Sequence, residues 1–218
     1  MAGEPVPVRG RLLALEGIDG CGKSTQARAL SEALGAELTY EPGATPLGAR
    51  LRELLLAPDA PPFADRTEAL LMAADRAEHV TQVVEPALAA GAWVVTDRFS
   101  ASTIAYQGYG RGLDSDGLRA LVSWAAAGVV PDLSVLVDVP VEVAAARLAA
   151  AGRRGADRLE RLGTDFAAAV RDGFLAQAAA EPGRWLVLDG TADAAGLTAH
   201  IVDVVHERFG DPPAARRR

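Results

Sequence analysis

Short apolar runs alternate along the chain with longer stretches in which apolar residues recur every three or four positions. The runs predict β-strands, and four of the five are almost continuously apolar, as expected for strands covered on both faces of a parallel sheet. The predicted strands are Leu12–Glu16, Glu37–Glu41, Trp93–Asp97, Leu133–Asp138 and Trp185–Asp189. The longer stretches predict helices at Lys23–Leu34, Leu47–Leu56, Arg66–Ala90, Asp116–Ala127, Val141–Ala150, Thr164–Ala180 and Ala192–Phe209.

This alternation predicts an α/β fold in which helices flank a doubly wound, five-stranded parallel sheet. Residues 1–210 are expected to form a single domain, and residues 211–218 a disordered tail. Ligands of such folds bind beyond the carboxyl ends of the strands. The predicted strands end on acidic residues, among them Glu16, Glu41, Asp97 and Asp138. The functional edge is therefore expected where these ends meet.

Net charge and cysteine content limit the binding partners and the cellular compartment that we expect. The net charge of −7 argues against a general attraction to nucleic acid or to an anionic membrane. The first eleven residues contain no long apolar run, so neither a signal peptide nor a membrane span is expected there. The single cysteine, Cys21, excludes an internal disulfide framework and fits a reducing compartment. We therefore expect a cytoplasmic protein.

One motif carries the chemistry. The segment Gly17–Ser24 fits the pattern G-x-x-x-x-G-K-[ST] between a predicted strand and a predicted helix, which is the context of a phosphate-binding loop. Its amides are expected to hold phosphate oxygens, while Lys23 reaches the β- and γ-phosphates and Ser24 ligates Mg²⁺. Lys23 is the only lysine, and a compact ammonium suits a loop wrapped around phosphate better than an arginine does. The alternative is a glycine-rich turn. The predicted ATP-binding residues are Gly17, Ile18, Asp19, Gly20, Cys21, Gly22, Lys23, Ser24 and Thr25.

Such a loop occurs in motors, switches and kinases. The chain has no Asn-Lys-x-Asp signature for guanine, which argues against a GTPase switch, and no second nucleotide-binding half that would suggest a motor. Its three histidines are scattered along helical patterns and predict no metal cluster. A kinase is thus favoured.

Several blocks together identify a family resemblance. From Leu13 to about Phe209 the sequence resembles bacterial thymidylate kinases, which are P-loop nucleoside monophosphate kinases. The resembling blocks are EGIDGCGKST, YEPGATPLGARLRELLL, LLMAADRAEHV, DRFSASTIAYQGYGRGL, PDLSVLVDVP and DRLERLG. The resemblance implies transfer of the γ-phosphoryl of ATP to dTMP, giving dTDP and ADP in dTTP synthesis, with Mg²⁺ as cofactor. It also implies a homodimer, for which the predicted helix Arg66–Ala90 is a candidate surface.

Two segments are expected to hold the acceptor phosphate. Asp97 and Arg98 follow a buried strand, so Asp97 is expected near Mg²⁺, and the resemblance assigns Arg98 to the acceptor phosphate during transfer. A strand-end salt bridge is the alternative for this pair. The resemblance also assigns Arg52 to that phosphate, whereas Arg50 does not match the family spacing and is expected to be solvated.

The base and sugar are expected to meet residues from three further segments. The resemblance assigns Arg76 to a thymine carbonyl and places Met72 where relatives usually stack a phenylalanine; simple core packing is the alternative for Met72. It places Asp19 near the transferred phosphate and acceptor sugar, with a capping role as the alternative. The remaining implied dTMP contacts are Glu41, Thr103, Tyr106 and Gln107.

Arginines concentrate between two predicted helices. Residues 151–163 resemble a lid that closes over ATP and supplies cations to the transition state. Of Arg153, Arg154, Arg158 and Arg161, we expect Arg153 and Arg158 to be catalytic, with a solvated basic loop as the alternative. Arg147, on the preceding helix, is expected against adenine or in a surface salt bridge.

The sequence departs from the family pattern at two more positions. Tyr40 stands where bacterial members often have arginine, and Phe99 replaces a frequent tyrosine. A kinase for another nucleotide or a deoxynucleoside, and a nucleotide-binding regulator without turnover, stay open as alternatives. Rates with a panel of acceptors distinguish the first, and the Arg98→Ala variant distinguishes the second.

Overall fold

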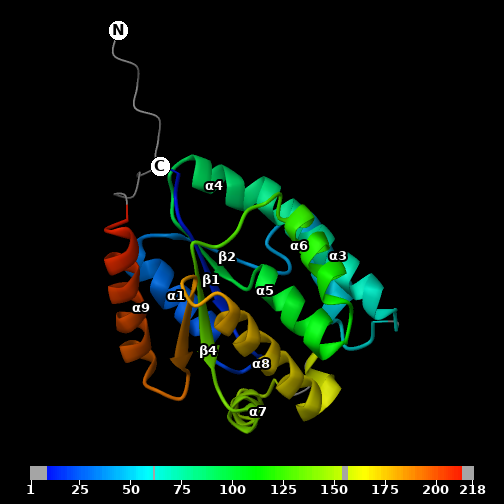
Figure 1. Ribbon diagram of the computed structural model, residues 1–218. Helices are drawn as coiled ribbons and strands as arrows, with labels where there is room; N and C mark the ends of the chain where they lie inside the picture. Colours follow the sequence, from blue (N-terminus) through cyan, green and yellow to red (C-terminus); the bar gives the residue numbers. More distant parts are fainter. Residues whose placement is uncertain (1–8, 61, 154–156, 213–218) are drawn as a thin grey trace.

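The computed structural model describes residues 9–60, 62–153 and 157–212 and contains the predicted parallel sheet (Figure 1). Its five strands lie in the order β2-β3-β1-β4-β5, and every neighbouring pair is parallel. The strands are β1 (Leu12–Glu16), β2 (Glu37–Tyr40), β3 (Val94–Asp97), β4 (Leu133–Asp138) and β5 (Trp185–Asp189). The prediction extended β2 and β3 by one residue each.

The burial of the strands follows their place in the sheet. All five residues of β1, the central strand, are buried, whereas three of the four residues of the edge strand β2 are exposed. β5 was predicted to be covered on both faces, but it forms the other edge, and Val187 is 47% exposed there. An edge strand has a neighbour on one side only, so an apolar run alone does not distinguish it from a central strand.

Helices cover both faces of the sheet (Figure 1). On one face, α1 (Lys23–Leu34) and α9 (Ala194–Phe209) pack on alternate residues of the central strands, including Leu13, Leu15 and Val135. On the other face, Leu12, Ala14 and Val94 meet a long helical segment. This alternation fits side chains that point to opposite faces along a strand.

That long segment agrees in extent with the helix predicted at 66–90, but it is not uniform. It consists of α3 (Asp65–His79), the π-helical turns η1 (Val80–Val84) and α4 (Glu85–Ala89). Pro86 lies at the start of α4. Since proline has no amide proton to donate, the regular hydrogen-bond ladder is interrupted there.

The prediction missed two helical segments and placed the others within two residues of their bounds. The longer missed segment is α5 (Ser100–Thr103) continued by the π-helical η2 (Ile104–Gly110), and its polar and glycine residues gave no clear apolar periodicity. The shorter one is the 3₁₀ turn η3 (Glu160–Leu162), which lies within the predicted lid. The other helices are α2 (Pro46–Leu56), α6 (Ser115–Ala125), α7 (Val141–Ala150) and α8 (Gly163–Ala180).

The strand order places a crevice at the end of β1. From β1 the chain proceeds to β2 and β3 on one side, while β4 and β5 lie on the other. Where the connections from two neighbouring strands run to opposite sides, a crevice forms beyond the carboxyl ends of these strands. The Gly17–Ser24 loop follows β1 at this point.

Two predicted features fall partly outside the described residues. Arg154 lies there, and so does the predicted tail from residue 213 onwards. None of the helices in the described part of the chain combines the length and apolar character that crossing a lipid bilayer requires.

Candidate active site

A cleft of about 610 Å³ opens at the carboxyl ends of the strands. It is lined by residues of the loop after β1, of the strands β2 and β3, of the helical segments α1, α2, α3, α5, η2 and α7, and of the segment after α7. Most predicted site residues are among them, namely Asp19, Gly20, Gly22, Lys23, Ser24, Thr25, Glu41, Arg52, Met72, Arg76, Asp97, Arg98, Thr103, Tyr106, Gln107, Arg147 and Arg153. The other four, Gly17, Ile18, Cys21 and Arg158, do not line it.

The loop after β1 needs glycine at two close backbone contacts. A Cβ atom on Gly17 would lie 2.7 Å from the carbonyl oxygen of Val137 at the end of β4, and the φ of Gly17 is +141°. A Cβ atom on Gly20 would lie 2.4 Å from the carbonyl oxygen of Ala144 in α7. The loop therefore packs directly on β4 and α7. Cys21 is buried in this contact, and burial raises the pKa of its thiol.

Lys23 begins α1 and points back into the loop. Its side chain is 7% exposed, and Nζ donates to the carbonyl oxygen of Ile18 at 3.3 Å and to Asp19 Oδ1 at 3.1 Å. The ammonium thus lies beside the loop amides and the positive end of the α1 dipole. This arrangement can bind the anionic oxygens of a polyphosphate.

Asp19 links the loop to β3 and η2. Its Oδ1 atom accepts from Arg98 Nη2 at 2.6 Å, and its Oδ2 atom accepts from the Tyr106 hydroxyl at 2.9 Å. Burial alone would raise the pKa of Asp19, but the charges of Arg98 and Lys23 hold it well below its usual range. Asp19 is therefore an ionised group shared by two cations, and not a simple helix cap.

Arg98 lies over the loop. Its φ is +75°, and its Nη1 atom donates to the carbonyl oxygen of Gly17 at 3.1 Å and to Ser102 Oγ at 3.0 Å. Its ion pair is with Asp19, and not with the strand-end residue Asp97 that the alternative interpretation required. The guanidinium consequently reaches across the cleft from β3 to the loop.

Asp97 offers an oxygen that the protein leaves unused. Within the described residues, its Oδ1 atom is buried and has no hydrogen-bond partner. Asp97 and Ser24 line the same cleft, and carboxylate and hydroxyl oxygens are ligands of Mg²⁺. The residues present fit the predicted ion. No group of three or more His, Cys, Asp or Glu residues in the described ranges is placed to hold a metal by itself.

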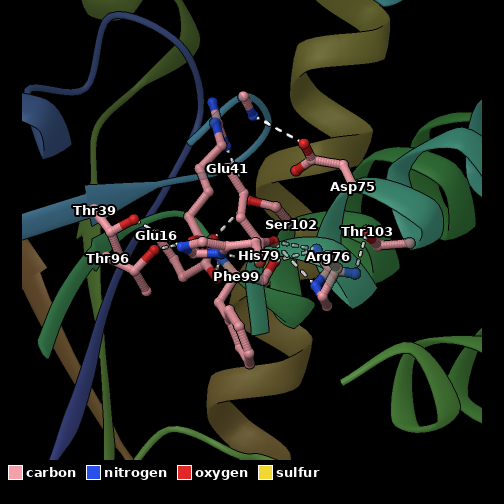
Figure 2. Close-up of polar contacts among 12 residues, drawn as sticks. Glu16, Thr39, Glu41, Asp75, Arg76, His79, Thr96, Phe99, Ser102 and Thr103 are labelled. Atoms are coloured by element: carbon pink, nitrogen blue, oxygen red, sulfur yellow. Dashed lines mark hydrogen bonds and ion pairs between the residues drawn. The ribbon is translucent and has the colours of Figure 1, made fainter. Parts of the chain in front are cut away.

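Arg76 is the centre of a hydrogen-bonded group in another part of the cleft (Figure 2). It is 2% exposed, and Nε and Nη2 donate to Glu41 Oε2 at 3.0 and 2.7 Å. Nη1 donates to Thr103 Oγ1 at 3.0 Å, and Nη2 also reaches the carbonyl oxygen of Phe99 at 3.1 Å. The predicted residues Arg76, Glu41 and Thr103 thus form one buried group, whose donor geometry is fixed before any ligand binds.

The sequence analysis missed the support behind this group. His79 is fully buried, and its Nδ1 atom lies 2.9 Å from Glu41 Oε1, while its Nε2 atom lies 2.7 Å from Thr39 Oγ1. Figure 2 shows His79 and Arg76 from the same helix converging on Glu41. Their spacing of three residues on one helical face could have indicated this contact.

Asp75 supports the turn after β2. Its Oδ1 atom accepts from the Gly43 amide at 3.0 Å. Burial, with a smaller contribution from Glu41, raises the pKa of Asp75 to about 6. This residue had not been predicted.

Met72 and Gln107 complete the part of the cleft predicted to hold the base. Met72 is partly buried and packs against the apolar cluster around Tyr106 while lining the cleft, so its packing and cleft-lining roles coexist. The amide of Gln107 donates to Glu68 Oε1 at 2.8 Å. Glu68, at the start of α3, is fully buried and was not predicted.

Two arginines at the margins of the cleft bind backbone carbonyl groups. Arg52 and Arg50 are both exposed, as was predicted for Arg50, but Arg52 Nη1 also donates to the Pro42 oxygen at 2.7 Å. Arg147 donates from Nη1 to the Cys21 oxygen at 3.0 Å and from Nη2 to the Gly190 oxygen at 2.9 Å. Arg147 therefore joins the phosphate loop to the end of β5, where a base could lie against it.

The two predicted lid arginines occupy different places. The side chain of Arg153 is 65% exposed and lines the cleft. Arg158 instead forms an ion pair with Glu68, donates to the Leu55 oxygen at 3.1 Å and lies 4.2 Å from the Phe63 ring centroid. Arg158 therefore anchors its segment to α2 and α3, and its catalytic role stays a prediction.

The glycine-rich loop lies where β1 and β4 diverge, and a cationic cleft leads from it to a polar pocket. This is the arrangement of a P-loop nucleotide kinase. Comparisons with known proteins narrow the class. The family model described as thymidylate kinase matches residues 15–201, and the chain belongs to this family. The resemblance read from the motifs is thereby confirmed.

The chain is similar to curated relatives along most of its length. It is 45% identical to a thymidylate kinase from Methylobacillus flagellatus, covering 92% of this chain and 98% of the relative. It is 47% identical to one from Chromobacterium violaceum, covering 89% and 92%. The crystal structure of thymidylate kinase from Ehrlichia chaffeensis matches with a TM-score of 0.71 at 32% identity, covering 90% of this chain and 99% of that chain.

Proposed function

We propose that this protein transfers the γ-phosphoryl group of ATP to dTMP, giving ADP and dTDP. One observation carries the assignment of the site to this reaction: Lys23, from the phosphate loop, and Arg98, from the opposite wall, bind the same carboxylate oxygen of Asp19. A donor phosphate on the loop and an acceptor phosphate at Arg98 would therefore lie next to each other. Phosphoryl transfer depends chiefly on such positioning and on charge stabilisation.

The acceptor would extend from Arg98 towards Arg76. In this placement Arg52 and Arg98 bind its phosphate, Tyr106 lies near the sugar, and Arg76 donates to a base carbonyl. Thr103, Gln107 and Met72 line the same region of the cleft. The Arg76 guanidinium already has four hydrogen bonds to Glu41, Thr103 and Phe99, so its orientation towards a base is set by the protein.

The donor would lie along the loop, with its base towards Arg147. Ser24 and the free Oδ1 atom of Asp97 would hold Mg²⁺, whose other ligands would be phosphate oxygens and water. A bound Mg²⁺ neutralises charge on the transferred phosphoryl group. We also infer that residues 151–163 act as a lid, with Arg153 the lid arginine that already lines the cleft.

A homodimer and a cytoplasmic location form part of the same proposal. The dimer is supported by apolar side chains on two neighbouring helices, because Leu70 of α3 is 53% exposed and Trp124 of α6 is 82% exposed. The location is supported by the single cysteine, which is free and buried, and by the nucleotide substrates. Sedimentation of the wild type and of Trp124→Glu tests the dimer.

Initial rates with MgATP and a panel of acceptors test the reaction. The panel consists of dTMP, dUMP, dCMP, AMP, GMP and thymidine, each followed by the release of ADP. We expect kcat/KM to be highest with dTMP. A preference for thymidine would identify a nucleoside kinase instead, and a preference for another monophosphate would overturn the assignment of the base site.

A further inference from the structure

We propose that Glu16 is a positioning residue for Arg98, and that it acts through Ser102 and the Phe99 amide. This inference rests on the proposed role of Arg98 at the acceptor phosphate. Glu16 ends β1, is fully buried and does not line the cleft. Any effect it has on transfer must therefore be carried by other residues.

The first connection runs through the backbone. Arg98 has a φ of +75°, a conformation that a non-glycine residue rarely adopts. The peptide group that joins Arg98 to Phe99 is held from both sides: its amide, that of Phe99, donates to Glu16 Oε1 at 2.9 Å, and its carbonyl oxygen, that of Arg98, accepts from Thr96 Oγ1 at 2.8 Å. Glu16 thus stabilises the strained turn that directs the Arg98 side chain over the loop.

The second connection runs through a side chain. Ser102 Oγ lies 2.6 Å from Glu16 Oε2 and 3.0 Å from Arg98 Nη1. A guanidinium can only donate hydrogen bonds, so the Ser102 hydroxyl accepts one from Arg98 and donates its own hydrogen bond to Glu16. Both oxygens of Glu16 therefore act as acceptors, which matches an ionised carboxylate. Figure 2 shows Glu16, Phe99 and Ser102 close together.

Burying the Glu16 carboxylate costs free energy, and packing at the end of β1 does not require a carboxylate there. A fully buried carboxylate loses its hydration, and burial raises the pKa of Glu16 to about 7 despite the hydrogen bond from Ser102 and the charge of Arg98. An apolar residue would fill the end of β1 without this cost. What the carboxylate provides is the fixed conformation of Arg98, since its two oxygens reach the Arg98 backbone and, by way of one hydroxyl, the guanidinium.

A mutant cycle tests the proposal. Ser102→Ala and Glu16→Gln are each made in the wild type and in Arg98→Ala, and rates are measured at pH 8 with saturating dTMP and MgATP, using enzyme in excess for the slow variants. We expect kcat of the wild type to fall at least about tenfold with either change, because small misplacements of a reacting group are costly. In the Arg98→Ala background, the same changes should alter the rate less than about twofold.

The control is Ser134→Ala, which removes a buried serine hydroxyl from β4, outside the contacts of Arg98. Its rate should stay within about twofold of the wild type. Equal loss with and without Arg98 would show that Glu16 and Ser102 serve only the fold, and would overturn the inference. Should Arg98→Ala itself retain full activity, the proposed role of Arg98 fails first. Urea unfolding reports folding, and Ser102→Ala, the smaller change, decides the matter if Glu16→Gln does not fold.

Discussion

Asp19 Oδ1 lies 2.6 Å from Arg98 Nη2, so the phosphate loop and the end of β3 are joined by an ion pair inside the cleft. The same oxygen lies 3.1 Å from Lys23 Nζ. Two cations that would meet phosphate thus share one protein carboxylate. A ligand phosphate must either compete with Asp19 or lie beside it.

The Asp19→Asn variant separates binding from transfer. Removing the negative charge leaves Lys23 and Arg98 free to attract an anion, so inorganic pyrophosphate should bind about fivefold more tightly, a change on the order of 1 kcal/mol. At the same time kcat should fall at least about tenfold, because Arg98 loses a fixed partner. Calorimetry and initial rates measure the two effects. Weaker pyrophosphate binding in this variant would contradict the proposed competition.

Lys23 should not be replaceable by arginine. Its ammonium is confined between the Ile18 carbonyl and Asp19, and a planar guanidinium is too wide for this position. Both Lys23→Ala and Lys23→Arg should lower kcat by roughly two orders of magnitude or more, since the charge acts on the transferred phosphoryl group. Thermal unfolding of each variant serves as the folding control. A Lys23→Arg variant with wild-type kcat would refute this account.

The sequence predicted the position of the loop between β1 and α1 because the motif is local. All residues from Gly17 to Thr25 are contiguous, and the strand and helix on either side are set by apolar patterns that a single segment contains. The arginines that face the loop depended on the family resemblance, since an isolated arginine is usually a surface residue. Their contacts, such as Arg98 with Asp19, join positions 79 residues apart.

The supports of the site could not be predicted from local pattern. His79, Glu68 and Glu16 are buried polar residues, and their partners come from other elements of the fold. The π-helical segment η2, which carries Tyr106 and Gln107, has glycine and polar residues that mask helical periodicity. The position of β5 at the sheet edge likewise depends on strand order, which apolar runs do not encode.

Two arginines on one helix give a matched test of the acceptor phosphate site. Both are exposed, but Arg52 lines the cleft and donates to the Pro42 oxygen, whereas Arg50, two residues earlier, does not line it. Arg52→Ala should raise the KM for dTMP at least about tenfold, as expected for a lost charge-assisted contact. Arg50→Ala should change it less than about twofold. Equal effects from both would show that Arg52 acts only through the general charge of α2.

Met72 offers a test of how the base is held. A flexible thioether lines the cleft where aromatic stacking would be more rigid. Met72→Phe should lower the Kd for dTMP about two- to fivefold, because replacing the thioether contact by ring stacking gains less than the roughly 1–3 kcal/mol of a full base–aromatic stack. The Kd for dUMP should fall by a similar factor. Calorimetric titration of each nucleotide measures this. An increase in both Kd values would instead assign Met72 to core packing, where a larger ring does not fit.

The raised pKa of Glu16 predicts how stability depends on pH. The folded protein holds this proton up to about pH 7, while the unfolded chain releases it near 4.5, the ordinary pKa of a glutamate side chain. Between these values the folded state binds more protons, so this residue's contribution to the free energy of unfolding falls as the pH rises. Asp75, whose pKa is raised to about 6, contributes to the pH dependence in the same direction. The positive charges of Arg98 and Arg76 limit how far the pKa of Glu16 rises.

Comparison with Glu16→Gln isolates the contribution of Glu16, because Asp75 is present in both proteins. Between pH 5 and pH 8, the free energy of unfolding of the wild type should fall relative to that of the variant by on the order of 2 kcal/mol. Urea unfolding at each pH measures the difference, and Glu32→Gln, an exposed change on α1, is the control. Parallel curves for the wild type and Glu16→Gln would mean that Glu16 titrates alike in both states. The ionised carboxylate that is proposed to hold Arg98 would then carry no cost of burial.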